Sequence, residues 1–189
     1  MIETTLTGGF SDAPHQSARA FRAILDALAR PGTIHTVTGA TPPAPLSLAA
    51  GVLLLTLADG TTPVHLAGER DTRATRDWIT FHTGAPLVGA AEATFAIGTW
   101  NTLHPLEQFS IGTPEYPDRA ATLIVELPAL FATGPRLSGP GIRDHAMLSL
   151  PEVAAFRANR SLYPLGFDCF FTASDQIAGL PRSTIVEDF

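Results

Sequence analysis

The stretch ATLIVEL, residues 121–127, carries apolar side chains with few interruptions. A half-exposed strand alternates apolar and polar residues, whereas a strand that is buried on both faces reads as a nearly continuous apolar run. Strands of the second kind occur in parallel sheets that helices cover on both sides. Residues 121–127 therefore predict a central strand of an α/β domain.

Helical and strand patterns alternate on both sides of this stretch. Strands are expected at residues 33–37, 63–67, 94–98, 167–173 and 183–186. Helices are expected at residues 12–30, 47–57, 72–84 and 149–163, with a helical turn at 103–109. This order predicts a three-layer α/β/α fold with a mixed, largely parallel sheet. Because the chain has 189 residues and no internal linker or repeat, residues 1–189 are expected to form a single domain.

Capping signals set the expected ends of the helices. Asp12 opens the first helix, whose apolar side chains recur at spacings of three and four and form one stripe: Ala18, Phe21, Leu25 and Leu28. Ser47 is expected to cap the second helix, and Asp71 or Thr72 the third. The sequence Ser149-Leu150-Pro151-Glu152 has the spacing of a capping box and predicts the start of the last helix.

All twelve cationic side chains are arginines, because the chain contains no lysine. A Schiff base with pyridoxal phosphate is therefore excluded, as is the phosphate-binding loop that ends in Lys-Ser or Lys-Thr. Arginine instead suits fixed ion pairs and the recognition of phosphate or carboxylate groups. A net charge of -6 argues against nucleic acid or an anionic membrane as a partner.

The proportions of charged and apolar residues bear on partners and location. Charged residues make up only 16% of the chain and apolar residues 45%, which predicts a surface that a partner covers. Neither a signal peptide nor a membrane span is expected, because the first ten residues lack a basic flank and the longest apolar run, residues 48–58, is short. The single cysteine, Cys169, excludes an internal disulfide and agrees with a cytoplasmic location.

The sequence LSGPGI, residues 137–142, places Gly139 and Gly141 around a proline, with Arg143 following. Such a loop can turn its backbone amides toward an anion, with the arginine alongside. The alternative is a tight turn without a ligand. Arg182 lies between a turn and the last predicted strand, where it can contact an anion or close a structural ion pair.

Acid-base and nucleophilic groups are scattered along the chain. His82 is expected in the last turn of a helix, where it can act as a general acid or bond the last carbonyls. Cys169 can be a nucleophile or a buried apolar side chain, and no G-x-S-x-G elbow supports a serine hydrolase. The histidines lack the H-x-x-x-H spacing of a metal site, so none is expected.

Several short motifs, taken in chain order, resemble one protein family. They are Phe10-Ser11-Asp12, Ala29-Arg30-Pro31-Gly32, Phe81-His82-Thr83-Gly84, Gly112-Thr113 with Tyr116-Pro117, residues 137–142, Asn159 with residues 164–168, and residues 180–184. Each motif is weak by itself, but their number and order are specific. Over essentially its full length the chain resembles the PhnH subunits of carbon-phosphorus lyase.

The resemblance implies a part in phosphonate breakdown. In that pathway subunits G, H and I, with the ATPase-like subunit L, join an alkylphosphonate to C1 of the ribose of ATP with loss of adenine. A separate radical enzyme, subunit J, later cuts the carbon-phosphorus bond. The resemblance also implies a fold similar to the large domain of pyridoxal-phosphate-dependent transferases, no cofactor, homodimers in isolation, and association with subunits G, I and J.

The chain is therefore expected to be a subunit without catalytic residues of its own. Its substrate or partner surface is expected at His82, Tyr116, Gly139, Gly141, Arg143 and Arg182. Two alternatives stay open: a small stand-alone hydrolase that uses Cys169 or a histidine, and an anion-binding module that uses Arg143 or Arg182.

Overall fold

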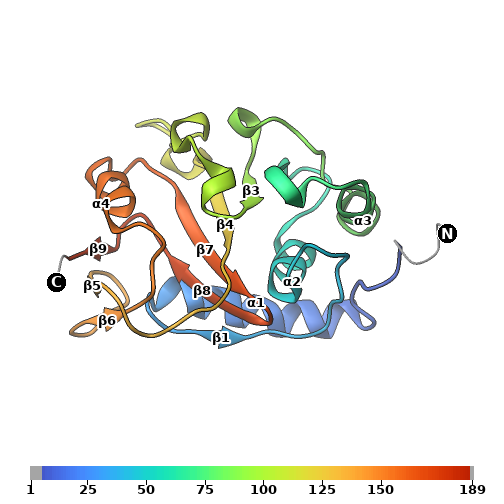
Figure 1. Cartoon of the computed structure of the whole chain (residues 1–189), viewed down its shortest axis with the longest axis horizontal. Helices are drawn as coiled ribbons and strands as arrows, with labels where there is room; N and C mark the ends of the chain where they lie inside the picture. Colours follow the sequence, from blue (N-terminus) through green and yellow to red (C-terminus); the bar gives the residue numbers. More distant parts are fainter. Residues whose placement is uncertain (1–5, 188–189) are drawn as a thin grey trace.

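The computed structural model describes residues 6–187, and a mixed six-stranded sheet forms the centre of this part of the chain (Figure 1). The strands lie in the order β1-β8-β7-β4-β3-β2. Their bounds are His35–Thr36 (β1), Val64–Leu66 (β2), Phe95–Gly98 (β3), Thr122–Glu126 (β4), Asp168–Ala173 (β7) and Gln176–Leu180 (β8). β2, β3, β4 and β7 run parallel, whereas β8 is antiparallel to β7 and β1. The predicted mixed, largely parallel sheet is confirmed.

The predicted central strand is β4, which lies between β3 and β7. Residues 123–126 are all buried. Ile124 belongs to the hydrophobic cluster on one face of the sheet, whereas Leu123 and Val125 belong to the cluster on the other face. The continuous apolar run is thus explained by burial on both sides.

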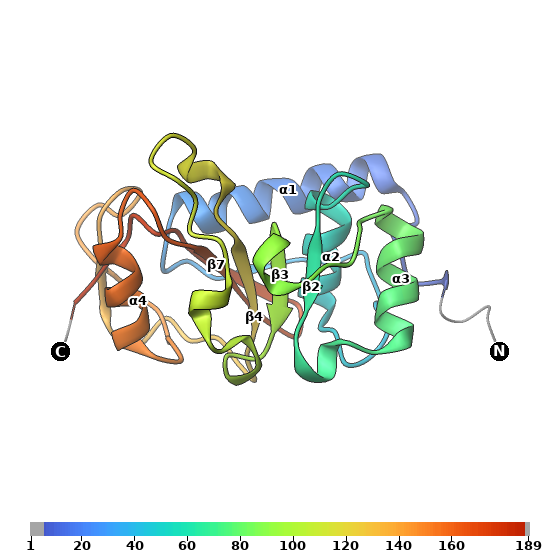
Figure 2. The same cartoon turned by 90° about the horizontal axis from the view of Figure 1, so that it is seen from above.

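Helices cover both faces of the sheet, as predicted. Helices α1 (Ala13–Ala29), α2 (Leu48–Leu57) and α3 (Arg73–Thr83) share one cluster, and α4 (Val153–Ser161) belongs to the other. Figure 2 shows α1 running along the length of the molecule, with α3 and α4 near opposite ends. The likeness to the large domain of pyridoxal-phosphate-dependent transferases stays a prediction.

Two of the predicted helix caps are present. The Ser47 hydroxyl accepts a hydrogen bond from the Ala50 backbone N–H, and the Thr72 hydroxyl accepts one from the Thr75 N–H. Gly84 ends α3 in the left-handed conformation, at φ 71°. The bonds satisfy N–H groups that have no partner within the first turn of a helix.

The predicted apolar stripe of α1 is wrong as a description of its buried face. The buried side chains are Ala20, Ile24 and Ala27. Phe21 and Leu25, which belong to the predicted stripe, are 48% and 53% exposed. Close approach to the sheet is the physical reason: a Cβ atom on Gly179 of β8 would meet the backbone of Ala27 at 2.7 Å. A small side chain is therefore required at Ala27, where α1 crosses Gly179, while Phe21 and Leu25 lie on the outer side.

The capping box predicted at residues 149–152 does not form. Helix α4 begins at Val153, and its N-cap residue, Glu152, makes no side-chain capping bond. The Ser149 hydroxyl instead accepts a hydrogen bond from Phe131 N–H, and the Glu152 carboxylate accepts one from Trp100 Nε1. Tertiary partners have replaced the local ones.

A second, three-stranded sheet lies beside α4 at one end of the molecule (Figure 1). Its order is β6-β5-β9, with bounds Ala146–Met147 (β6), Arg136–Ser138 (β5) and Ile185–Val186 (β9). The strand predicted at residues 183–186 therefore pairs here, and not in the main sheet. The chain leaves the main sheet after β8, and β9 pairs with β5.

Candidate functional site

Arg182 holds the start of β7 and a neighbouring loop together. Its Nε and Nη2 donate to the two carboxylate oxygens of Asp168 at 3.1 and 2.6 Å. Its Nη1 donates to the carbonyl oxygen of Pro117 at 2.7 Å. The side chains are only 13% exposed for Arg182 and 24% for Asp168. The guanidinium is therefore occupied by the protein itself, in a bidentate pair with an additional backbone contact.

The loop that Arg182 holds contains the predicted residue Tyr116. Thr113 and Tyr116 exchange backbone hydrogen bonds of 3.1 and 3.0 Å, so the loop is a tight turn. The Tyr116 ring is half exposed, and the guanidinium of Arg119 lies 4.0 Å from its centre. The turn thus presents a stacked aromatic and cationic pair to the surface.

Gly139 and Gly141 form a turn wedged between two other segments. Both have positive φ, 121° and 82°, and Ile142 N–H donates to Gly139 O. A Cβ atom on Gly139 would lie 3.3 Å from Ser183 O, and one on Gly141 would overlap Ala29 O at the end of α1. Both glycines are therefore required by backbone packing. Both interpretations of this loop predict a turn, and contact of the turn with an anion stays a prediction.

The structure brings some of the predicted site residues together and separates others. Arg182 bonds the turn of Tyr116, and the next residue along the chain, Ser183, packs against Gly139. Arg143 follows the glycine turn and is exposed, and it makes no ion pair or hydrogen bond within residues 6–187. His82 does not belong to this group, because it lies on α3 near the opposite end of the molecule (Figure 1).

His82 packs among aromatic rings in the last turn of α3. Its ring centre lies 5.0 Å from that of Trp78 and 4.9 Å from that of Phe81. Its Nε2 is buried and has no hydrogen-bond partner among the described residues, and Gly9 lies against the ring. The predicted bond to the last carbonyls of the helix is not among its contacts in the part of the chain that the structure describes.

Cys169 is 1% exposed within β7. Burial, together with the negative charge of the adjacent Asp168, raises the pKa of the thiol well above its ordinary value. Because the thiolate is the nucleophile, this cysteine is chemically inert in the folded protein. The apolar interpretation of Cys169 agrees with its environment.

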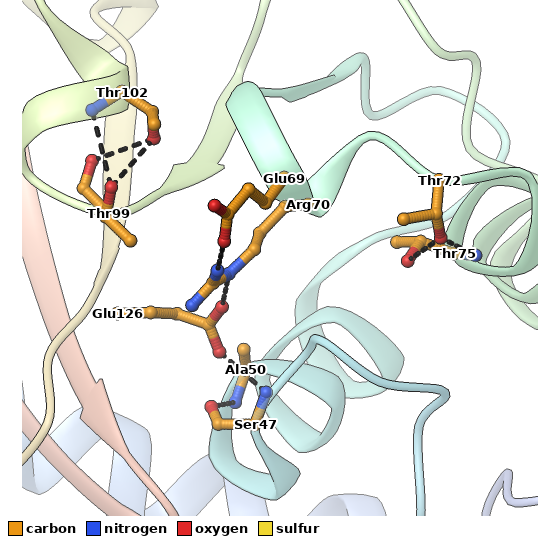
Figure 3. Close-up of polar contacts among 9 residues, drawn as sticks. All are labelled: Ser47, Ala50, Glu69, Arg70, Thr72, Thr75, Thr99, Thr102 and Glu126. Atoms are coloured by element: carbon orange, nitrogen blue, oxygen red, sulfur yellow. Dashed lines mark hydrogen bonds and ion pairs between the residues drawn. The ribbon is translucent and has the colours of Figure 1, made fainter.

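The sequence analysis missed a buried ion pair at the carboxyl edge of the parallel strands (Figure 3). Glu126 ends β4, and its carboxylate accepts hydrogen bonds from Arg70 Nε and, at 2.6 Å, from the backbone N–H of Ser47. The side chains are 15% exposed for Arg70 and 3% for Glu126. A carboxylate that ends an otherwise apolar buried strand was the available signal, because a buried charge needs a partner.

This ion pair ties three elements together. Arg70 follows β2, Glu126 ends β4, and Ser47 caps α2, so the N-terminus of α2 is fixed against the sheet. In open α/β sheets ligands bind at the carboxyl edge. Figure 3 shows Arg70 at this edge, with Glu69 3.7 Å from its guanidinium, and a turn in which the Thr99 and Thr102 hydroxyls lie 3.1 Å apart.

Residues 6–187 also bear on the questions of a metal site and of a membrane span. The described residues contain no group of three or more histidine, cysteine, aspartate or glutamate side chains that could hold a metal ion. None of the helices in this part of the chain has the length and apolar character needed to cross a membrane.

Comparison with known proteins assigns the chain to a family. Residues 8–187 match the model of a bacterial phosphonate metabolism protein, PhnH. The chain belongs to the PhnH family. It is 40% identical to the alpha-D-ribose 1-methylphosphonate 5-triphosphate synthase subunit PhnH of Rhizobium meliloti, over 96% of this chain and 95% of the relative. It is 28% identical to a putative C-P lyase subunit protein, HtxG, of Stutzerimonas stutzeri, over 91% and 86%.

Motifs that carried the resemblance to PhnH make structural contacts. The Asn159 side chain accepts a bond from Phe167 N–H and donates one to Phe167 O, each at 2.9 Å. Asp168, in the same motif, binds Arg182. These PhnH motifs therefore include residues with a structural role, because they hold loops onto the sheet.

Proposed function

We propose that this chain is a subunit of the synthase that joins an alkylphosphonate to C1 of the ribose of ATP with release of adenine. One observation carries the proposal: 40% identity that extends over 96% of the chain to a subunit of alpha-D-ribose 1-methylphosphonate 5-triphosphate synthase. The match covers both sheets and all the contacts described above, so it concerns the whole domain.

The subunit contributes shape and contacts to the synthase and no catalytic group. The chain has no lysine, its one thiol is buried with a raised pKa, and Arg182 is occupied by Asp168 and Pro117. These observations support a dependent subunit over a stand-alone hydrolase. The occupied guanidinium also argues against the alternative of an anion-binding module that uses Arg182, whereas the exposed Arg143 stays available to a neighbouring chain.

Subunits G, I and J are the proposed partners, with the ATPase-like subunit L acting in the same reaction. Two exposed features are candidate contact surfaces for these partners: the outer side of α1, with Phe21 and Leu25, and the turn at Tyr116. In isolation the outer side of α1 is the proposed homodimer contact, because exposed apolar side chains at a spacing of four residues can pack across a two-fold axis.

The test is a reconstitution with defined subunits. The purified chain is incubated with ATP and methylphosphonate, alone and with subunits G, I and L, and free adenine is measured by chromatography. Adenine is expected only when the partners are present, and omission of this chain from the mixture is expected to abolish it. Adenine release by this chain alone would refute the dependent role.

A further inference from the structure

An open groove of about 650 Å³ runs between α4 and the segment of residues 104–111. Ala154, Ala155 and Ala158 form its wall on α4. Leu106 and Ile111 line it from the opposite segment. Its volume falls within the range of about 300 to 1,000 Å³ that is typical of binding pockets. The groove lies on the opposite face of the main sheet from α1 and α2.

The groove offers apolar surface and few free polar groups. Ala154 and Ala158 are exposed at a spacing of one helical turn, and Leu162, 44% exposed, continues the same line. Asn159 also lines the groove, but its amide is occupied by both backbone groups of Phe167. Small side chains on an exposed helix allow another backbone to approach closely.

The charges at the edge of the groove are negative. Glu107 is exposed, and Glu152 is exposed at the N-terminus of α4, where its carboxylate accepts a bond from Trp100 Nε1 at 2.9 Å. His104 Nε2 lies 3.6 Å from the Glu152 carboxylate. An occupant with apolar side chains that enter the groove and a cationic side chain at its edge complements this surface.

We propose that the groove between α4 and residues 104–111 binds an apolar segment of a partner subunit, flanked by at least one basic residue. The inference rests on the proposed membership in the synthase. The arrangement matches the recognition mode in which an amphipathic segment places apolar anchors into a groove. A second copy of this chain fits less well, because a two-fold contact would bring the carboxylates of both copies together.

The chain itself permits a sharp footprinting experiment. Its one cysteine is buried and inert, so an Ala158→Cys variant carries a single accessible thiol. The rate of alkylation by N-ethylmaleimide is followed by mass spectrometry, for the variant alone and for its complex with co-expressed subunits G, I and J. Ala91→Cys, at an exposed position of the short helix Ala90–Glu92, is the matched control, because it lies outside both the groove and α1.

The rate at Ala158→Cys is expected to fall at least about tenfold in the complex, while the control rate changes less. Ala158→Arg is expected to release the partner and leave the melting temperature of the isolated chain unchanged. An unchanged alkylation rate in an intact complex would overturn the groove as a docking site, with the proposed function left standing. Failure of the unmodified chain to co-purify with any partner would overturn both.

A further arm tests the kind of occupant. ATP and methylphosphonate are added to the isolated Ala158→Cys variant, and alkylation is measured again. No protection is expected, because the groove lacks free polar groups suited to phosphate. Protection by either compound without a partner would overturn the assignment to a polypeptide segment. Glu107→Arg in the complex is expected to weaken association more than Glu107→Gln, and equal binding by both would contradict the basic flank.

Discussion

Replacement of Arg182 by alanine removes a largely buried guanidinium and leaves Asp168 behind. The variant loses two charge-assisted bonds to Asp168 and one bond to Pro117 O. Breaking a fully buried ion pair costs about 3 to 5 kcal/mol, and breaking an exposed one about 0 to 1 kcal/mol. The 24% exposure of Asp168, and its retained bond from the residue 182 backbone N–H at 2.8 Å, allow partial compensation. We expect a loss of about 2 to 3 kcal/mol.

Urea unfolding followed by circular dichroism measures this loss, and thermal melting should fall by about 4 to 12 °C for a domain of this size. Arg182→Lys is the matched control, because it keeps the charge but not the bidentate fork, and should recover only part of the stability. In a double-mutant cycle with Asp168→Asn, a coupling of at least 1 kcal/mol, as an order-of-magnitude estimate, is expected. A loss below about 0.5 kcal/mol for Arg182→Ala would show that the pair is only a surface contact.

Three further changes test other parts of the structure. Gly141→Ala should lower the free energy of unfolding in urea by about 2 kcal/mol or more, because the residue has φ 82° and its Cβ would overlap Ala29 O. Gly89→Ala is the control: a Cβ atom there would meet nothing within 4 Å, and the free energy should change by less than about 0.5 kcal/mol. Glu126→Ala should cost about 3 kcal/mol, because it leaves the largely buried Arg70 with only the exposed Glu69 as an ionic partner and removes the acceptor of the Ser47 N–H. A cost near zero in thermal melting would contradict the buried pair. Burial raises the pKa of Cys169 in the folded protein above the unfolded value of about 8.5. The contribution of this thiol to the free energy of unfolding is therefore complete below that pH. It is lost as the pH rises toward the folded pKa, by up to about 1.4 kcal/mol per pH unit. Urea unfolding between pH 8 and 10 should show this decline in the wild type and a shallower one in Cys169→Ala.

Local signals in the sequence predicted most of the secondary structure. Ser47 and Thr72 cap helices as expected, because each bond involves residues three apart in the chain. The continuous apolar run of residues 121–127 predicted a strand buried on both faces, and β4 is buried in that way. Strand β8, residues Gln176–Leu180, was not predicted, and its Gly179 weakens the strand signal because the position is reserved for the backbone of α1.

The candidate site was predicted less well than the fold. The glycine turn was predicted from its composition, and an ion pair of Arg182 was one of two predicted alternatives, but the Arg70–Glu126 pair was missed. These two residues are 56 positions apart, and only the pairing of β2, β3 and β4 brings their strand ends to one edge. Nothing in the local sequence of Arg70 distinguishes it from a solvated arginine.

The sequence by itself determined most of the helices and strands, their order along the chain, and the chemistry that the lack of lysine excludes. Apolar periodicity, caps and turns act between neighbouring residues, and the lack of lysine is a property of composition. The tertiary structure alone decided which face of α1 is buried and which partners Ser149 and Glu152 take. It did so because α1 crosses Gly179 of β8 closely at Ala27, and because a distant donor with good geometry can replace a local cap. Such choices depend on distances between segments, which no local pattern records.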